Sequence, residues 1–264
     1  GISDNIALQD KLREGKTALA HAGEKYAQLA NRSELYSLVP VVKGDDIVPI
    51  ESGLTRLELT SVYKNFFARR GKPARNIYDK LLLSAKGRCP FCGGMGNPRN
   101  LDPYLSKSDF PQYSLLPINL IPSCRDCNMD GKGTSSPETS EEQLLQPYFD
   151  KDAFFKEQWI FAEYSGQKGN EPGVFEYFVS PPESWEQIDQ DRVVKHFTSF
   201  DLAIRYGLKA AELLAEVQKQ IVRFRSMNLS DEDIKAVLLD PMIEEAPFVN
   251  HWRVGMAQAL IDSL

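Results

Sequence analysis

The segment that decides the fold is RNLDPYLSKSDFPQYSLLPINLIPSCRDCNMDGKG, residues 99–133, together with the Cys89-Pro-Phe-Cys92 turn before it. All four cysteines of the chain fall in two C-x-x-C pairs, Cys89 with Cys92 and Cys124 with Cys127. Two such pairs supply the tetrahedral thiolate shell that structural Zn²⁺ prefers. Disulfides are the alternative, but a reducing cytosol disfavours them, and a redox C-x-x-C would need only one pair on a βαβ background. We therefore predict a structural zinc site.

The residues between and after the cysteine pairs predict a strand, a second strand and a short helix. Residues 99–105, RNLDPYL, have extended character, and so have residues 117–124, PINLIPSC, which contain two prolines. Residues 124–133, CRDCNMDGKG, indicate a short helix that ends at glycine. A zinc ion that staples these elements would bring three polar side chains together: Asp102, Asn119 and Asn128.

Length and composition bound the class of protein. The chain has 264 residues, of which 42% are apolar and 26% charged, as in soluble globular proteins. The sequence has no apolar run of bilayer-spanning length and no secretion signal, so we expect a cytoplasmic protein. The opening Gly1-Ile2 indicates a processed or trimmed end.

The charge is distributed unevenly. A net charge of −6 argues against a protein coated with nucleic-acid-binding charge. Between Lys64 and Arg88, however, eight basic residues stand against Asp79 alone. This basic stripe leads into the cysteine motif, where it could follow a phosphate backbone, or it could be the solvated face of two helices.

Apolar periodicity predicts helices over much of the remaining chain. The helical stretches lie within residues 5–39, 54–70, 74–87, 201–227 and 248–264. Residues 173–182 alternate apolar and polar side chains, as a short strand does. Ser230 and Asp233 have the spacing of a capping box at the start of a further helix.

The order of the motifs resembles that of bacterial HNH endonucleases. The C-x-x-C pair is followed by L-D-x-Y-L-x-K-S-x-x-P at 101–111 and by P-x-N-L-x-P-x-C-x-x-C-N-x-x-x-K at 117–132. This order is similar to HNH proteins with a ββα-metal core and a four-cysteine zinc site, most of all to those paired with an ATPase in anti-phage systems of the Septu type. Residues 146–164, 178–185 and 192–206 also resemble the C-terminal part of that group.

The resemblance implies a mostly α protein with a small α+β insert. In this fold, a ββα-metal core with structural zinc is embedded between N-terminal and C-terminal helical regions. The expected divisions are an N-terminal helical region at 1–74, a zinc-stapled HNH-like domain at 75–150, and a strand pair with helices at 151–264.

The resemblance also implies roles for individual residues. Asp102 and Asn128 would bind a catalytic Mg²⁺ or Mn²⁺, Asn119 would orient the base and its loop, and Lys132 would lie near the phosphate. The four cysteines would bind structural Zn²⁺. The expected DNA contacts are basic residues in or beside the motif: Lys86, Arg88, Arg99, Lys107 and Arg125. The expected partners are DNA and an ATPase of a defence complex, without a membrane.

The position of the family's general base departs from the pattern. That base is the histidine directly after the metal-binding aspartate, and this chain has Pro103 there. Proline has no ionisable group and cannot take a proton from the attacking water. The three histidines, His21, His196 and His251, all lie outside the motif. His196 is the best candidate among them for a replacement base.

Two functions remain open on the sequence. The chain is either an HNH-type DNA endonuclease of an anti-phage complex, impaired or inactivated by Pro103, or an inactive zinc-stabilised relative that binds DNA or a partner ATPase. A nuclease with a relocated base and a deliberately disabled variant are both compatible with the proline. A positioned general base contributes ~10²–10⁴ in rate, so a site that keeps its metal could still cleave slowly.

Overall fold

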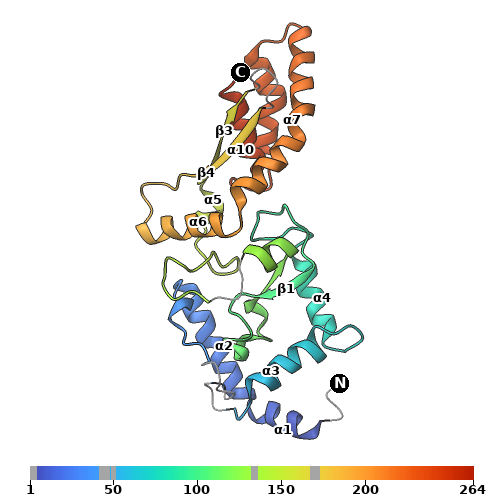
Figure 1. The fold of residues 1–264 in the computed structure, drawn as a ribbon, viewed down its shortest axis with the longest axis vertical. Helices are drawn as coiled ribbons and strands as arrows, with labels where there is room; N and C mark the ends of the chain where they lie inside the picture. The colour runs from blue at the N-terminus through green and yellow to red at the C-terminus, as the bar shows by residue number, and fades with distance from the viewer. Residues whose placement is uncertain (1–4, 42–47, 49–51, 132–135, 167–172) are drawn as a thin grey trace. The chain divides into compact units, whose positions relative to one another are not determined.

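The computed structural model describes residues 5–41, 48, 52–131, 136–166 and 173–264. The chain divides into two compact units, residues 1–150 and 151–264, which are described separately below. More than half of the residues are helical, and the described strands form two small antiparallel sheets (Figure 1). The prediction of a mostly α chain with a small β content is therefore confirmed. Within the described residues, no helix combines the length and the apolarity that a membrane crossing requires.

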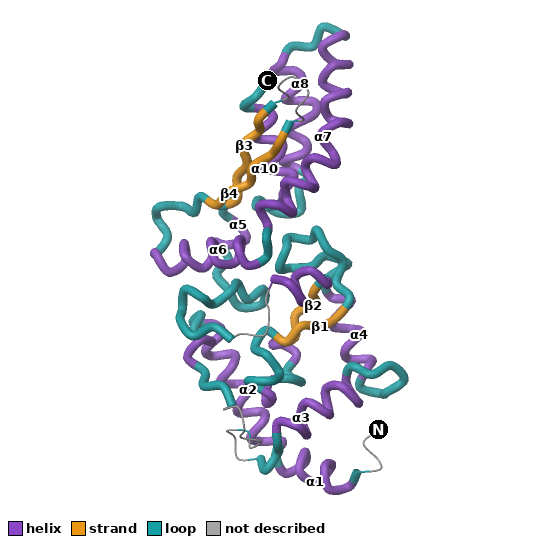
Figure 2. The backbone as a smooth tube through the Cα atoms, in the orientation of Figure 1, coloured by secondary structure: helices purple, strands orange, loops and turns teal. Residues whose placement is uncertain are grey.

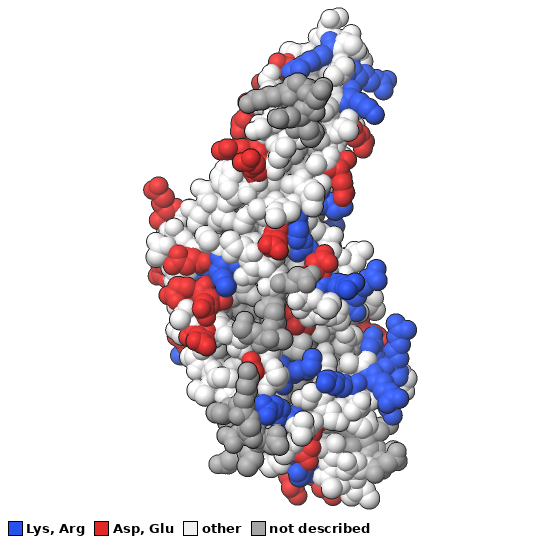
Figure 3. Space-filling view, in the orientation of Figure 1, with Lys and Arg blue, Asp and Glu red and all other residues white. Residues whose placement is uncertain are grey.

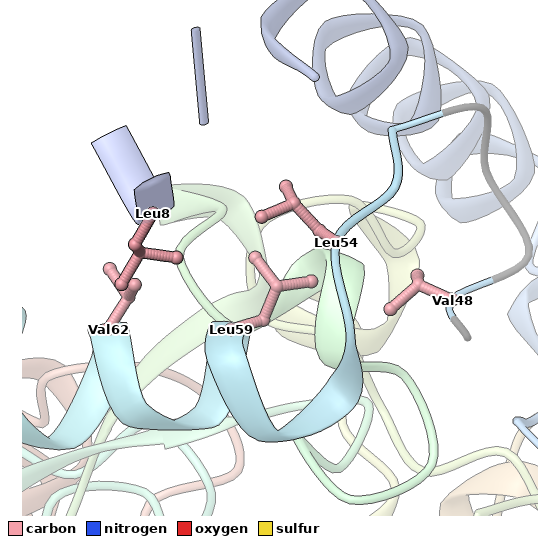
Figure 4. Close-up of a cluster of buried hydrophobic side chains, with 5 residues drawn as sticks. All are labelled: Leu8, Val48, Leu54, Leu59 and Val62. Atoms are coloured by element: carbon pink, nitrogen blue, oxygen red, sulfur yellow. The ribbon is translucent and has the colours of Figure 1, made fainter. Parts of the chain in front are cut away.

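Four α-helices open the first unit: α1 (Ile6–Glu14), α2 (Lys16–Asn31), α3 (Arg56–Val62) and α4 (Arg75–Ser84). A capping box starts α3, because the Thr55 hydroxyl accepts from the Glu58 N–H at 3.2 Å and the Glu58 carboxylate accepts from the Thr55 N–H at 2.8 Å. Figure 4 shows the apolar contacts that hold α1 against α3. This buried cluster consists of Leu8, Val48, Leu54, Leu59 and Val62.

The cysteine-bearing part of the first unit contains the predicted strands. Strand β1 (Asn100–Pro103) pairs antiparallel with β2 (Leu120–Ser123), and both lie together in Figure 2. Residues 125–131 then form a short helical segment, which includes the π-helical turn η5 (Cys127–Gly131). Two 3-10 turns, η3 (Pro111–Tyr113) and η4 (Pro117–Asn119), lie in the connection between the strands. The strand, strand and short helix predicted from the sequence are all present.

An aromatic cluster joins the N-terminal helices to the strands. The π-helical turn η2 (Tyr63–Phe67) continues α3 and contributes Tyr63 and Phe67 to the cluster. These rings pack with Tyr78 of α4, and the Phe67 and Tyr78 centroids are 5.6 Å apart in an edge-to-face arrangement. Leu101 of β1 and Leu120 of β2 complete the cluster. Residues 1–74 and 75–150 therefore share a hydrophobic core.

The second unit packs helices on a two-stranded sheet. Its strands, β3 (Ile160–Ser165) and β4 (Val174–Val179), are antiparallel, with Ile160 opposite Val179. Its helical elements are α5 (Ala153–Lys156), α6 (Gln187–Ser199), α7 (Leu202–Ser226), α8 (Asp231–Ile234), η6 (Lys235–Leu239), α9 (Asp240–Glu244) and α10 (Trp252–Ile261). Helix α10 packs on β3 and α7 on β4. The predicted capping box of Ser230 and Asp233 starts α8.

Candidate functional site

The four cysteines form one buried cluster. Their sulfur atoms all lie within 4.8 Å of one another, and each residue is at most 3% exposed. The Sγ atoms of Cys92 and Cys124 are 3.9 Å apart, too far for a disulfide. A Zn–S distance of about 2.3 Å in a tetrahedral site separates neighbouring sulfurs by about 3.8 Å. The geometry and chemistry of the four donors therefore fit a structural zinc ion.

The turn of the first pair is shaped by glycine. Gly93 and Gly94 have φ angles of +59° and +86°, a conformation that residues with a side chain rarely adopt. The Gly94 N–H donates to the Cys89 carbonyl at 2.8 Å, and the Gly96 N–H lies 3.4 Å from the Cys92 sulfur. These bonds fold the chain around the two sulfurs, as a metal-binding turn requires.

The four thiols shift one another's pKa through hydrogen bonds, down for Cys89 and Cys124 and up for Cys92 and Cys127. Hydrogen bonds with Cys127, then Cys89 and Cys92, lower the pKa of Cys124. Hydrogen bonds with Cys124, then Cys89 and Cys92, raise the pKa of Cys127. A cation at the centre would compensate the negative charge of the four thiolates.

Gly96 is a site residue that the spacing of cysteines does not reveal. A Cβ added at this position would lie 2.5 Å from both the Cβ and the Sγ of Cys124. Such a distance is far below van der Waals contact, so a side chain at 96 would have to displace the cysteine. Glycine is therefore required here by the close approach of two segments 28 residues apart.

Strand β1 carries Asp102 in a fixed position. Asp102 is 7% exposed and lies opposite Ile121. Two tyrosines bind the backbone of the neighbouring Leu101. The Tyr63 hydroxyl donates to the Leu101 carbonyl at 3.0 Å, and the Leu101 N–H donates to the Tyr78 hydroxyl at 2.9 Å. Burial first, then Tyr78 and Asp102, raise the pKa of Tyr63, which keeps that hydroxyl protonated as a donor.

Pro103 lies where strand pairing requires no N–H. The Tyr104 N–H donates to the Asn119 carbonyl at 2.6 Å, so the pairs 104–119 and 102–121 are hydrogen-bonded and the pairs between them are not. Pro103 is in one of these non-hydrogen-bonded pairs, opposite Leu120, and the proline therefore removes no bond from the ladder. Strand alternation places its side chain on the face of Leu101, opposite that of Asp102.

Asn119 is buried, and its side chain binds the loop that follows β1 through three hydrogen bonds. Its side-chain oxygen accepts from the Leu105 N–H at 2.8 Å, and its amide nitrogen donates to the carbonyls of Leu105 and Tyr113 at 3.1 and 3.0 Å. With no exposed surface, Asn119 lies out of reach of a substrate. The structure therefore gives it a positioning role on residues 105–113, which include Lys107.

The remaining predicted residues lie on and around the same module. Asn128 is half-buried in η5, and its N–H donates to the Cys124 carbonyl at 3.1 Å. Lys132, predicted near the phosphate, is outside the described residues. Four of the five expected DNA contacts are exposed: Lys86, Arg88, Arg99 and Arg125.

Lys107 is the half-buried member of the expected DNA contacts. Its ammonium nitrogen lies 5.2 Å from the centroid of the Tyr63 ring. Burial first and then the charge of Lys64 lower the pKa of Lys107, whereas the charge of Asp102 raises it. The charges of Lys64 and Asp102 therefore both reach Lys107.

The three histidines have other surroundings. His21 is exposed on α2, and the His251 side chain accepts from the Arg253 N–H at the start of α10. His196 is buried on α6, where its ring lies 4.8 Å from that of Phe200. His196 and His251 belong to the second unit, whereas Asp102 belongs to the first.

We expect the purified chain to contain one zinc ion, and Cys124→Ser to lose it. Zinc bound to structural cysteines stabilises folding by about 10 kcal/mol or more in small metal-binding domains, so the variant should unfold around the metal site. Elemental analysis and far-UV circular dichroism measure both effects. Met129→Ser is the control, since Met129 is 61% exposed two residues after Cys127. A chain that folds equally well without zinc would contradict the assignment.

Replacement of Gly96 by alanine should weaken zinc binding about ten- to a hundred-fold, because overpacking of ~1–3 kcal/mol falls on the Cys124 ligand. Competition with a zinc chelator measures the change. Gly166→Ala is the matched control, since a Cβ at 166 would meet its nearest neighbour at an ordinary 3.8 Å. Equal zinc affinities of the two variants would show that Gly96 is not required.

Asn119→Ala should destabilise the first unit by about 3 kcal/mol, since three hydrogen bonds of ~1 kcal/mol each are lost. Urea unfolding of the zinc-loaded chain by circular dichroism measures the loss. All three tryptophans lie in residues 151–264, so their fluorescence follows the second unit separately as an internal reference. Asn65→Ala, at an exposed position with one side-chain bond, should change stability by less than about 0.5 kcal/mol. A similar cost at both positions would contradict the positioning role of Asn119.

Comparison with known proteins places the chain in a family. No model of a known protein family matches it, and no solved structure matches it. It is 34% identical over 251 residues to protein ea31 of Escherichia phage lambda, an alignment that covers 91% of this chain and 83% of ea31. That name describes no activity. The chain belongs to the family of the phage lambda protein ea31.

Proposed function

We propose that the chain is an HNH-type, metal-dependent DNA endonuclease whose general-base position is occupied by Pro103. The proposal includes a role as the effector of an anti-phage complex with a partner ATPase. The defence role and the ATPase rest on the sequence resemblance alone. The nuclease chemistry has further support from the arrangement of the described residues.

The observation that carries the proposal is the order of elements on the cysteine cluster. Strand β1 with Asp102, antiparallel β2 and the helical segment with Asn128 follow one another in the order that a ββα-metal core requires. Ile121 pairs with Asp102 and lies three residues before Cys124, whose carbonyl accepts from the Asn128 N–H. The cluster therefore ties both expected metal ligands to one small module.

The donor set suits a hard divalent cation. Asp102 offers a carboxylate and Asn128 an amide oxygen, and Mg²⁺ is commonly held by one or two protein oxygens with water and substrate phosphate completing its shell. Such an ion supplies charge stabilisation on the scissile phosphate. Asp102 and Asn128 would hold the ion, and Lys107 would contact a phosphate oxygen beside them. Pro103 accepts no proton, so the attacking water would be activated poorly.

A second candidate, an inactive relative that binds DNA or a partner ATPase, is favoured by the setting of residue 103. Pro103 is buried in β1, costs the ladder no hydrogen bond, and shares the face of Leu101 rather than that of Asp102. The pairing of β1 with β2 therefore accommodates a proline at this position. A relative without catalytic activity needs no general base and can have proline at position 103.

Nicking of supercoiled plasmid with Mg²⁺ or Mn²⁺, with and without a partner ATPase, separates the two candidates. We expect weak nicking by the natural chain and none by Asp102→Ala. Under the nuclease candidate, Pro103→His should nick about 10²–10⁴ faster, a result that requires the imidazole at the end of β1 to turn toward Asp102. Pro103→Ala is the control for loss of the ring alone. Silence from every form, with zinc bound and the fold intact, would refute the nuclease and favour the binding protein.

A further inference from the structure

The segment from Tyr63 to Lys72 carries a dense positive charge with no acidic residue. It reads YKNFFARRGK and contains Lys64, Arg69, Arg70 and Lys72. Lys64, Arg69 and Arg70 are exposed, and Lys72 is half-buried. Figure 3 shows Lys and Arg side chains gathered over the region between α3 and α4. In a chain of net charge −6, this concentration calls for an explanation.

These cations have few acidic neighbours. In the described part of the chain between Lys64 and Arg88, the ion pair that forms is between Arg75 and Asp79, at 2.8 Å. Helix α7 is different, because it carries Glu212 and Glu216 among its cations and Lys209 pairs with Glu212 at 2.7 Å. A solvated helix face is expected to resemble α7, with charges of both signs. The Tyr63–Lys72 segment is arranged for an anion from outside the chain.

The turn η2 places two ammonium groups on aromatic rings. The Lys107 nitrogen lies 5.2 Å from the Tyr63 ring centroid, and the Lys72 nitrogen lies 5.6 Å from that of Phe66. Because Tyr63 and Phe66 are three residues apart on η2, the two cations are held along one short element. Irregular turns of this π-helical kind are frequent at functional sites.

The same turn is connected to Asp102. The Tyr63 hydroxyl donates to the Leu101 carbonyl at 3.0 Å, directly before Asp102 in β1. The charges of Lys64 and Asp102 both act on Lys107. The positive charge therefore extends from the neighbourhood of Asp102 along η2 to Arg69, Arg70 and Lys72.

We propose that residues 63–72 form a phosphate track, defined by Lys64, Arg69, Arg70 and Lys72, that binds the phosphodiester backbone of nucleic acid and leads it to Asp102. The inference deepens the proposed function, on which it rests for the destination of the strand. A series of cations without acidic neighbours fits an extended polyanion, and the half-buried Phe66 offers a ring to a base or sugar. The track predicts a substrate that extends several nucleotides beyond the reacting phosphate.

The test is nucleic-acid binding by the zinc-loaded full chain, without Mg²⁺ or Mn²⁺, at 50–300 mM salt. Fluorescence anisotropy is measured with a 30-base-pair duplex and a single strand of equal length. The track variant carries Lys64→Ser, Arg69→Ser, Arg70→Ser and Lys72→Ser. The matched control removes two lysines and two arginines that are also exposed: Lys25, Arg32, Lys219 and Arg223. Arg69→Ser with Arg70→Ser is the milder variant if the first loses zinc or helix content.

We expect the slope of log affinity against log salt to fall by about 3–4 for the duplex, because each phosphate contact contributes ~0.9. The slope of the control should change by less than about one. A loss confined to the single strand also supports the track and identifies its substrate form. Equal effects of the two variants, or no nucleic-acid binding by the natural chain, would overturn the proposal. Tighter, track-dependent binding of poly-glutamate would overturn it in favour of an acidic protein partner.

Binding and nicking separate this inference from the proposed function. Track-dependent binding by a chain that never nicks DNA contradicts the nuclease and leaves the track intact. Nicking that is unaffected by the track variant, with binding unchanged, contradicts the track and leaves the nuclease intact.

Discussion

The convergence of four cysteine sulfurs is the constraint on which the candidate site depends. Strands β1 and β2 contain four residues each, and a two-stranded sheet of that length has little stability of its own in water. The cysteine pairs lie before β1 and after β2, so a metal bound by all four closes the module at both ends. That metal would also fix the positions of the loop between the strands and of the turn that carries Asn128.

The N-terminal helices supply the other half of the support. Tyr63 and Tyr78 bond to the backbone of Leu101, and their rings bury the apolar face of β1 and β2. Asp102 therefore lies on a strand that is supported by an aromatic core and flanked by the cysteine cluster. Two lysines bring positive charge near Asp102: Lys64 on η2, and Lys107 on the loop that Asn119 holds in place. On η2, the residue that supports β1, Tyr63, is thus followed directly by the positively charged Lys64.

The sequence predicts those features that depend on local spacing. Two C-x-x-C pairs predict the sulfur cluster, extended stretches bounded by prolines predict the strands, and apolar periodicity predicts α7. Features that depend on contacts between distant segments are not visible in it. The aromatic residues near position 63 indicate a core, but no pattern shows that the Tyr63 hydroxyl reaches Leu101, 38 residues away. Gly96 and Cys124 illustrate the same limit, since the need for glycine arises only where the two segments meet.

X-ray absorption at the zinc edge of the purified chain tests the central claim most directly. A shell of four sulfur atoms at about 2.3 Å is the result that the cysteine cluster requires. Absence of zinc, or a shell with nitrogen or oxygen in place of sulfur, would contradict it and remove the support on which the positions of Asp102 and Asn128 depend.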